Sequence, residues 1–158
     1  MSVLEDSNVV VPVRPLDDNG GNGRLAMVVF SGTMDRLMPV GILASGAVAM
    51  GMDVDIFLTF WGLQAFAKRS QGQPPKFSGD YADMAPMFAQ VMKEKNVPSP
   101  FETLKTAKKL GHVRIYACTM TMDLLGQKKD DFIDLVDATA GVGEFMDLAK
   151  DAKTTLFI

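Results

Sequence analysis

Short apolar runs alternate with helical patterns along most of the chain, and this alternation limits the fold more than any other feature. Leu25 to Phe30 is a continuous apolar run of strand length, and similar runs follow at 54–59, 113–117, 134–138 and 154–158. Strands that are buried on both faces read as such runs. The pattern predicts an α/β fold, a single open parallel sheet of about five strands with helices on both faces, of the flavodoxin-like kind.

The segments between these runs carry helical periodicity. Helices are expected at about 35–50, 63–69, 84–92, 99–110, 119–125 and 141–150. The sequence Ser99-Pro100-Phe101-Glu102 has the spacing of a capping box, in which a hydroxyl and a carboxylate satisfy each other's backbone amides and proline occupies the first helical position. Asp35 is expected to cap the first long helix in a similar way.

The first 23 residues lack this order. Pro12 to Gly23 is rich in proline, glycine, asparagine and aspartate, and apolar order begins abruptly at Leu25. We therefore expect residues 1–23 to form a disordered leader and residues 24–158 to form one α/β domain, which is a usual size for a single domain.

Residues 71–97 interrupt the strand–helix alternation. Proline and glycine come first, and then one face of a helix carries Met84, Met87, Phe88, Val91 and Met92. Such a face is expected to be covered by the core or by another subunit. The alternative is an adaptable lid, because methionine suits surfaces that re-pack. The sequence leaves open whether the 71–97 insertion is a lid or a subunit contact.

Composition excludes several classes of function. The formal net charge of -3 argues against nucleic acid as a partner. One cysteine and one histidine exclude an intrachain disulfide and a cysteine–histidine metal cage, and no Gly-x-Gly-x-x-Gly or P-loop pattern is present, so neither metal nor cofactor is expected. The longest uncharged run, 37–52, is shorter than the roughly 20 apolar residues of a membrane span, so membrane association is not expected and a cytoplasmic location is.

The carboxyl ends of the predicted strands indicate where a site would lie. In open parallel sheets, ligands and chemistry gather at that edge. The residues that follow the strands there and would line a pocket are Ser31, Gly32 and Thr33, then Phe60, Trp61 and Gly62, then Cys118, Thr119, Met120 and Asp123, with 139–141 after the fourth strand.

Cys118 is the candidate catalytic residue. It follows a strand and precedes a helix, where unpaired backbone N–H groups would stabilise a thiolate. Position 121 is threonine, so no dithiol forms, and position 124 is leucine where a cysteine phosphatase needs arginine. His112 lies at the other end of the same strand, about 20 Å away. A lone thiolate of this kind suits a carrier that accepts sulfur as a persulfide and passes it on.

Three blocks of sequence strengthen this interpretation. They are 27–35 (MVVFSGTMD), 57–62 (FLTFWG) and 115–126 (IYACTMTMDLLG). With them the chain resembles the DsrE/DsrF-like sulfur-relay family, in particular its long DsrE-like branch, often labelled peroxiredoxin-family or sulfur carrier, over residues 24–158. The resemblance implies a homo-oligomer, Cys118 as the sulfur-bearing residue, and TusA-like or rhodanese-like sulfur carriers as partners. Ile115 and Gly111 replace the peroxiredoxin signature residues, so peroxide reduction is not implied.

Two functional hypotheses follow. The first is a sulfur carrier or sulfurtransferase acting through a Cys118 persulfide. In it the Thr119 amide holds the anionic sulfur, Phe60 and Trp61 keep water away, and Asp123 bonds to a neighbouring loop. The alternative is a non-catalytic α/β module that binds a small ligand or a protein partner, with Cys118 inert. Thiol reactivity near neutral pH separates the two.

Overall fold

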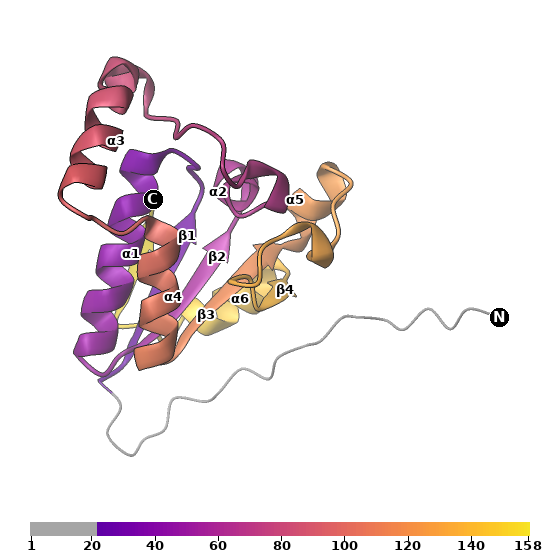
Figure 1. Cartoon of the computed structure of the whole chain (residues 1–158). Coiled ribbons are helices and arrows are strands. Elements are labelled where there is room, and N and C mark those ends of the chain that lie inside the picture. Colours follow the sequence, from indigo (N-terminus) through magenta and orange to yellow (C-terminus); the bar gives the residue numbers. More distant parts are fainter. Residues whose placement is uncertain (1–21) are drawn as a thin grey trace.

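The structure, a computed structural model, describes residues 22–158, so the leader predicted at 1–23 lies almost entirely outside the described residues. The strands are β1 (Arg24–Val29), β2 (Asp53–Leu58), β3 (Val113–Cys118), β4 (Ala138–Ala140) and β5 (Thr154–Phe157). The α-helices are α1 (Met34–Ala49), α2 (Phe60–Ala65), α3 (Ala85–Glu94), α4 (Pro100–Leu110), α5 (Thr119–Leu124) and α6 (Val142–Ala149). Figure 1 shows their arrangement.

All five strands form one parallel sheet in the order β4-β3-β2-β1-β5. From β1 to β4 the chain steps across the sheet in one direction, with α1 and α4 side by side on one face (Figure 1). The chain then reverses direction, and α6 crosses the other face before β5 pairs with β1. Because crossover connections are right-handed, a reversal of direction moves the connecting helix to the opposite face. The predicted fold class is confirmed.

Each face of the sheet has its own core. On the first face, α1 and α4 bury Leu37, Val40 and Leu104 against the strands. On the second face, α6 contributes Phe145 and Leu148 to a smaller cluster, whose other members are Ala26, Phe57, Tyr116, Cys118, Ala138 and Ala140. We call this smaller group the α6 cluster. Since side chains alternate between the two faces of a strand, Tyr116 and Cys118 share this face of β3.

The predicted capping box at α4 is confirmed, whereas the expected cap of α1 is wrong. Ser99 Oγ accepts a hydrogen bond of 3.2 Å from the Glu102 amide, and Glu102 accepts one of 2.7 Å from the Ser99 amide. Thr33 is the N-cap residue of α1. Asp35 lies in the first turn of that helix, and its carboxylate accepts a hydrogen bond of 3.1 Å from the Ser78 amide.

The fourth strand was expected at 134–138, but β4 begins only at Ala138. Residues 134 and 135 form a turn, in which the Val136 amide donates to the Ile133 carbonyl. Pairing with β3 starts where the Asp137 amide donates to the Ile115 carbonyl over 2.8 Å. Val136 is buried in the core without being part of a strand, so its apolar character reflects packing in a loop rather than strand pairing.

The helix expected at 63–69 is also displaced. It begins at Phe60, directly after β2, and ends at Ala65, and a separate 3-10 turn covers Lys68–Ser70. The Phe60 amide at the start of this helix donates a hydrogen bond to Thr121 of α5.

The 71–97 insertion projects beyond the sheet at the upper left of Figure 1. It contains a 3-10 segment (Gly79–Met84) and α3. No residue of α3 is buried, so the expectation that its apolar face belongs to the core of this chain is wrong. The insertion is attached to α1 through the Met34 amide, which donates to the Lys76 carbonyl over 2.7 Å, and through the Ser78 amide, which donates to Asp35 Oδ1 over 3.1 Å. A ring contact between Phe77 and Phe88 joins two parts of the insertion itself.

Among the helices of residues 22–158, none combines the length and the apolar character needed to cross a lipid bilayer.

Candidate functional site

Cys118 is the last residue of β3 and the N-cap residue of α5. It lies in register with Ala140 of β4, so it occupies the carboxyl edge of the sheet as predicted. Its side chain belongs to the α6 cluster, and the residue is 5% exposed. The thiol is therefore enclosed mainly by apolar groups, while the first-turn amides of α5, which have no acceptor within the helix, follow it directly in the chain.

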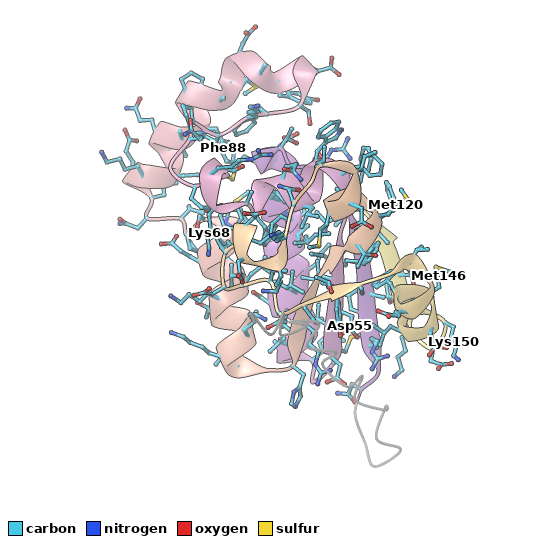
Figure 2. All side chains as sticks on the ribbon, turned by 90° about the vertical axis from the view of Figure 1, so that its right-hand side faces the viewer. Asp55, Lys68, Phe88, Met120, Met146 and Lys150 are labelled. Carbon is cyan, nitrogen blue, oxygen red and sulfur yellow. The ribbon has the colours of Figure 1, made fainter. Side chains whose placement is uncertain are left out.

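The four loops at this edge lie next to one another in the order of their strands. The loop after β4 reaches α5, because a Cβ atom on Gly141 would lie 3.9 Å from Thr119 Oγ1. Thr119 is half-buried, whereas Met120 is 62% exposed. Figure 2 shows Met120 of α5 and Met146 of α6 on the same side of the molecule, and α6 packs on the cluster that contains Cys118.

The loops after β1 and β2 approach each other through their backbones. A Cβ atom on Gly32 would lie 2.3 Å from the Trp61 carbonyl oxygen, and one on Gly62 would lie 2.2 Å from the Val29 carbonyl oxygen. The Gly62 amide donates a hydrogen bond of 2.7 Å to the Phe30 carbonyl. Only glycine leaves room for this approach, which explains why these two predicted site residues carry no side chain.

A buried threonine joins the loop after β2 to the helix after Cys118. Thr121 is 0% exposed, and its Oγ1 atom accepts a hydrogen bond of 3.1 Å from the Phe60 amide. The same oxygen lies 3.2 Å from Thr59 Oγ1. Phe60 has a φ angle of 45°, in the left-handed region that a bulky residue rarely adopts. The contact therefore holds the backbone amide of Phe60, the first residue of α2.

Aromatic side chains form a row along the edge. The ring of Phe30 lies 6.0 Å from that of Phe157 and 5.6 Å from that of Phe60, and the rings of Phe60 and Trp61 are 6.3 Å apart. We call these four residues the aromatic row. Trp61 is 58% exposed and Phe157 is 71% exposed, so the row presents a large part of its surface to solvent. The proposal that Phe60 and Trp61 shield Cys118 from water stays a prediction.

The remaining predicted site residues are Ser31, Thr33 and Asp123, and none of them belongs to the α6 cluster around Cys118. The hydroxyl oxygens of Ser31 and Thr33 are 3.2 Å apart, within the turn that leads into α1. Asp123 is exposed on α5, one turn beyond Cys118. Its expected hydrogen bond to a neighbouring loop stays a prediction.

Sequence reasoning missed a buried polar network on the same face as Cys118. Arg24 Nε lies 2.8 Å from Asp55 Oδ2, and the Tyr116 hydroxyl donates to Asp55 Oδ1 over 3.2 Å. Arg24 also donates to the Leu148 carbonyl of α6 over 3.2 Å. The network therefore fastens the end of α6 over the cluster that contains Cys118. The signal in the sequence is Asp55, a carboxylate that lies between apolar residues in the middle of β2.

Burial sets the protonation behaviour of this network. It raises the pKa of Asp55, against the opposing effects of the Arg24 charge and the Tyr116 hydroxyl. It also raises the pKa of Tyr116 to about 12, helped by the negative charge of Asp55. A cavity beside these groups, which Asp53, His112 and Arg114 also line, has a volume of about 20 Å³, room for one water molecule. It lies at the amino edge of the sheet, opposite Cys118.

Within residues 22–158, no group of three or more histidine, cysteine, aspartate or glutamate side chains is arranged to hold a metal ion.

Comparison with known proteins places this site in a wider context. The family model described as DsrE/DsrF/DrsH-like matches residues 21–77 and 78–157. Uncharacterized protein YrkE of Bacillus subtilis (strain 168) is 35% identical over 156 residues, which cover 85% of this chain and 96% of the relative. Sulfur carrier protein DsrE2 of Allochromatium vinosum is 32% identical over 157 residues, which cover 85% of this chain and 98% of the relative.

Solved structures that match the chain include the following one. A protein of unknown function from Methanobacterium thermoautotrophicum matches with a TM-score of 0.55 and 14% sequence identity, over 87% of this chain and 100% of that chain. At this identity the likeness concerns the fold alone.

Proposed function

Because the chain belongs to the DsrE/DsrF/DrsH-like family, we propose that it is a sulfur carrier that holds sulfane sulfur as a persulfide on Cys118 and passes it to a partner. The observation that carries this proposal is the position of Cys118. It is the only cysteine of the sequence, and it lies between the carboxyl end of a central strand and the start of a helix. Parallel α/β sheets commonly place their chemistry at this edge.

The proposed reaction needs no oxidant and no second cysteine in this chain. The Cys118 thiolate attacks the outer sulfur of a donor persulfide, a new S–S bond forms, and the donor leaves as a thiolate. In the second step an acceptor thiolate attacks the outer sulfur of the Cys118 persulfide, and Cys118 leaves as a thiolate. Sulfur moves at the same oxidation level in both steps, so electrons and charge balance.

The surroundings of Cys118 suit a reactive sulfur species. The apolar α6 cluster limits contact with water. The unpaired amides at the start of α5, beginning with Thr119, supply donors for an anionic sulfur. The loop at Gly141 adds a second wall beside Thr119.

Intact-mass spectrometry tests the proposal directly. Incubation with polysulfide, or with thiosulfate and a rhodanese, should add mass in units of sulfur, and dithiothreitol should remove it. Cys118→Ser should abolish the gain. A matched control places a thiol elsewhere on the same helix, in the double variant Cys118→Ser/Leu124→Cys, because Leu124 is 67% exposed. Reversible loading of Cys118→Ser, or equal loading of the displaced thiol, would refute the proposal.

The burial of Cys118 favours one competing function, a non-catalytic module with an inert thiol. A buried free cysteine often acts as a small apolar side chain. The two functions differ in the rate of alkylation by iodoacetamide at pH 7. A carrier thiol should react at least as fast as free cysteine, whereas an inert thiol enclosed by the α6 cluster should react much more slowly.

We further propose that the partners are TusA-like or rhodanese-like sulfur carriers and that the protein forms a homo-oligomer. A purified TusA-like protein should gain the sulfur mass that the loaded chain loses. The support for an oligomer is apolar surface on two helices. Ile42 on α1 is 62% exposed, Met50 directly after α1 is 65% exposed, and Met87 on α3 is 53% exposed. Large apolar side chains that gather at the surface commonly mark an interface, and this supports the proposed oligomer.

A further inference from the structure

The inference concerns Thr121, which stands where a dithiol motif would have its second cysteine. It is 0% exposed, although threonine is a polar side chain. Buried hydroxyl groups are retained where they have hydrogen-bond partners. Here the partners are the Phe60 amide at 3.1 Å and the Thr59 hydroxyl at 3.2 Å, both on the loop after β2. The side chain of Thr121 therefore connects two loops of the carboxyl edge.

The connection holds a strained turn. Phe60 has a φ angle of 45°, and a bulky residue keeps such a conformation only when its surroundings hold it there. On the side of β3, Thr121 Oγ1 accepts a hydrogen bond from the Phe60 amide. Two residues later, on the side of β1, the Gly62 amide donates a hydrogen bond to the Phe30 carbonyl. The turn is fixed from both sides, and its aromatic side chains join the aromatic row.

Thr121 is also close to Cys118 in the chain. It follows Cys118 by three residues and lies in the first turn of α5. A hydroxyl that fixes this turn against the loop after β2 also fixes the start of α5, whose N-cap residue is Cys118. The Phe60–Trp61 turn and Cys118 thus belong to one mechanically connected unit.

We infer that Thr121 is a positioning residue for Cys118, whose hydroxyl keeps the Phe60–Trp61 turn closed beside the thiol and so controls access to it. The inference rests on the proposed sulfur-carrier function for its biological meaning. Access should open when the hydroxyl is removed, because the Phe60 amide then loses its acceptor and the strained turn relaxes.

The sequence supplies two probes for a test, since it contains one cysteine and one tryptophan. Thr121→Val removes the hydroxyl at nearly constant shape, and Thr121→Ser keeps it. In Thr121→Val we expect iodoacetamide to alkylate Cys118 roughly three- to tenfold faster, the factor that corresponds to one lost hydrogen bond. The fluorescence anisotropy of Trp61 should fall in the same variant. Thr121→Ser should match the unmodified protein in both measurements.

A lower melting temperature in Thr121→Val, with alkylation rate and anisotropy unchanged, would show a purely structural role and overturn the inference. Should Thr121→Val fail to fold, amide hydrogen exchange on the unmodified protein decides. The Phe60 amide must be protected, and exchange at the rate of an open loop would overturn the inference. Sulfur loading of the unmodified protein tests the carrier function separately, because alkylation and anisotropy need no sulfur donor.

Discussion

The hydroxyl of Tyr116 donates a hydrogen bond of 3.2 Å to the carboxylate of Asp55 on the neighbouring strand, on the same face of the sheet that buries Cys118. Asp55 is paired with Arg24, and Arg24 reaches the end of α6. These contacts join β3, β2, β1 and α6 on the face of the sheet that holds Cys118.

Removing the Tyr116 hydroxyl should weaken the fold. Tyr116→Phe leaves one oxygen of a buried carboxylate without its donor, so we expect a loss of about 1–3 kcal/mol in the free energy of unfolding. Denaturant titration measures it. The matched control is Tyr81→Phe, because Tyr81 is 57% exposed and should lose almost nothing. Equal stabilities of the two variants would contradict the role of the network.

The same hydroxyl should titrate late. In Tyr81→Phe only Tyr116 remains as a tyrosine, and its absorbance change should have a midpoint near pH 12. Because this pKa is raised in the folded state, the stability that the protonated hydroxyl contributes is present below about pH 10, the ordinary value for tyrosine, and is lost as the pH rises toward 12. A midpoint near 10 would show that Tyr116 is not buried beside Asp55.

A methyl group at position 62 should be costly. Gly62→Ala places a Cβ atom 2.2 Å from the Val29 carbonyl oxygen, which is backbone and cannot move aside easily. We expect a loss of more than about 2 kcal/mol in stability. Gly46→Ala is the control, since the space around that helical glycine is open, and it should gain about 0.5–1 kcal/mol. Thermal or chemical unfolding compares them, and similar losses in both would contradict the close approach.

The attachment of the 71–97 insertion should weaken in acid. Desolvation alone would raise the pKa of Asp35, but hydrogen bonds from Ser78 and Thr33 outweigh it and lower the pKa. A lowered pKa in the folded state means that the contribution to stability is present at neutral pH and is lost as the pH falls through the folded value. Asp35→Asn should imitate this loss at neutral pH. Hydrogen exchange should then rise within residues 76–97 while the sheet stays protected, and uniform protection in both proteins would contradict it.

The apolar side of α3 should carry part of the interface between subunits. Met87→Lys places a charge on this side and should shift the molar mass from light scattering toward the monomer. Ala89→Lys, on the opposite side of the same helix, should leave the assembly intact. A protein that is monomeric at micromolar concentration before any substitution would contradict the oligomer itself.

Local patterns in the sequence were enough for most of the fold. The continuous apolar runs predicted the strands because both faces of the sheet are covered. The capping box at Ser99 was recognisable because it needs only residues three positions apart. Cys118 was placed at a strand-to-helix junction by the same local reasoning, which the structure confirms.

Long-range contacts explain what was missed. Val136 is apolar and buried, yet it packs in a loop, since β4 pairs with β3 only from Ala138 onward. At the start of α2, the Phe60 amide bonds to Thr121, which is far away in the sequence. Phe60 also has a φ angle of 45°, a conformation that no local pattern in the sequence indicates. The apolar side of α3 has helical periodicity, but within residues 22–158 no contact buries any residue of this helix.

The sequence by itself determined the α/β class, the helix caps that are local, and the edge of the sheet where Cys118 lies, because these depend on periodicity and on neighbours within one turn. Only the tertiary structure decided which loops meet at that edge. The backbone approach at Gly62, the hydroxyl of Thr121 beneath Phe60 and the burial of Arg24 with Asp55 all join residues from different strands and helices. Such contacts depend on strand order and on three-dimensional packing, which no local pattern encodes.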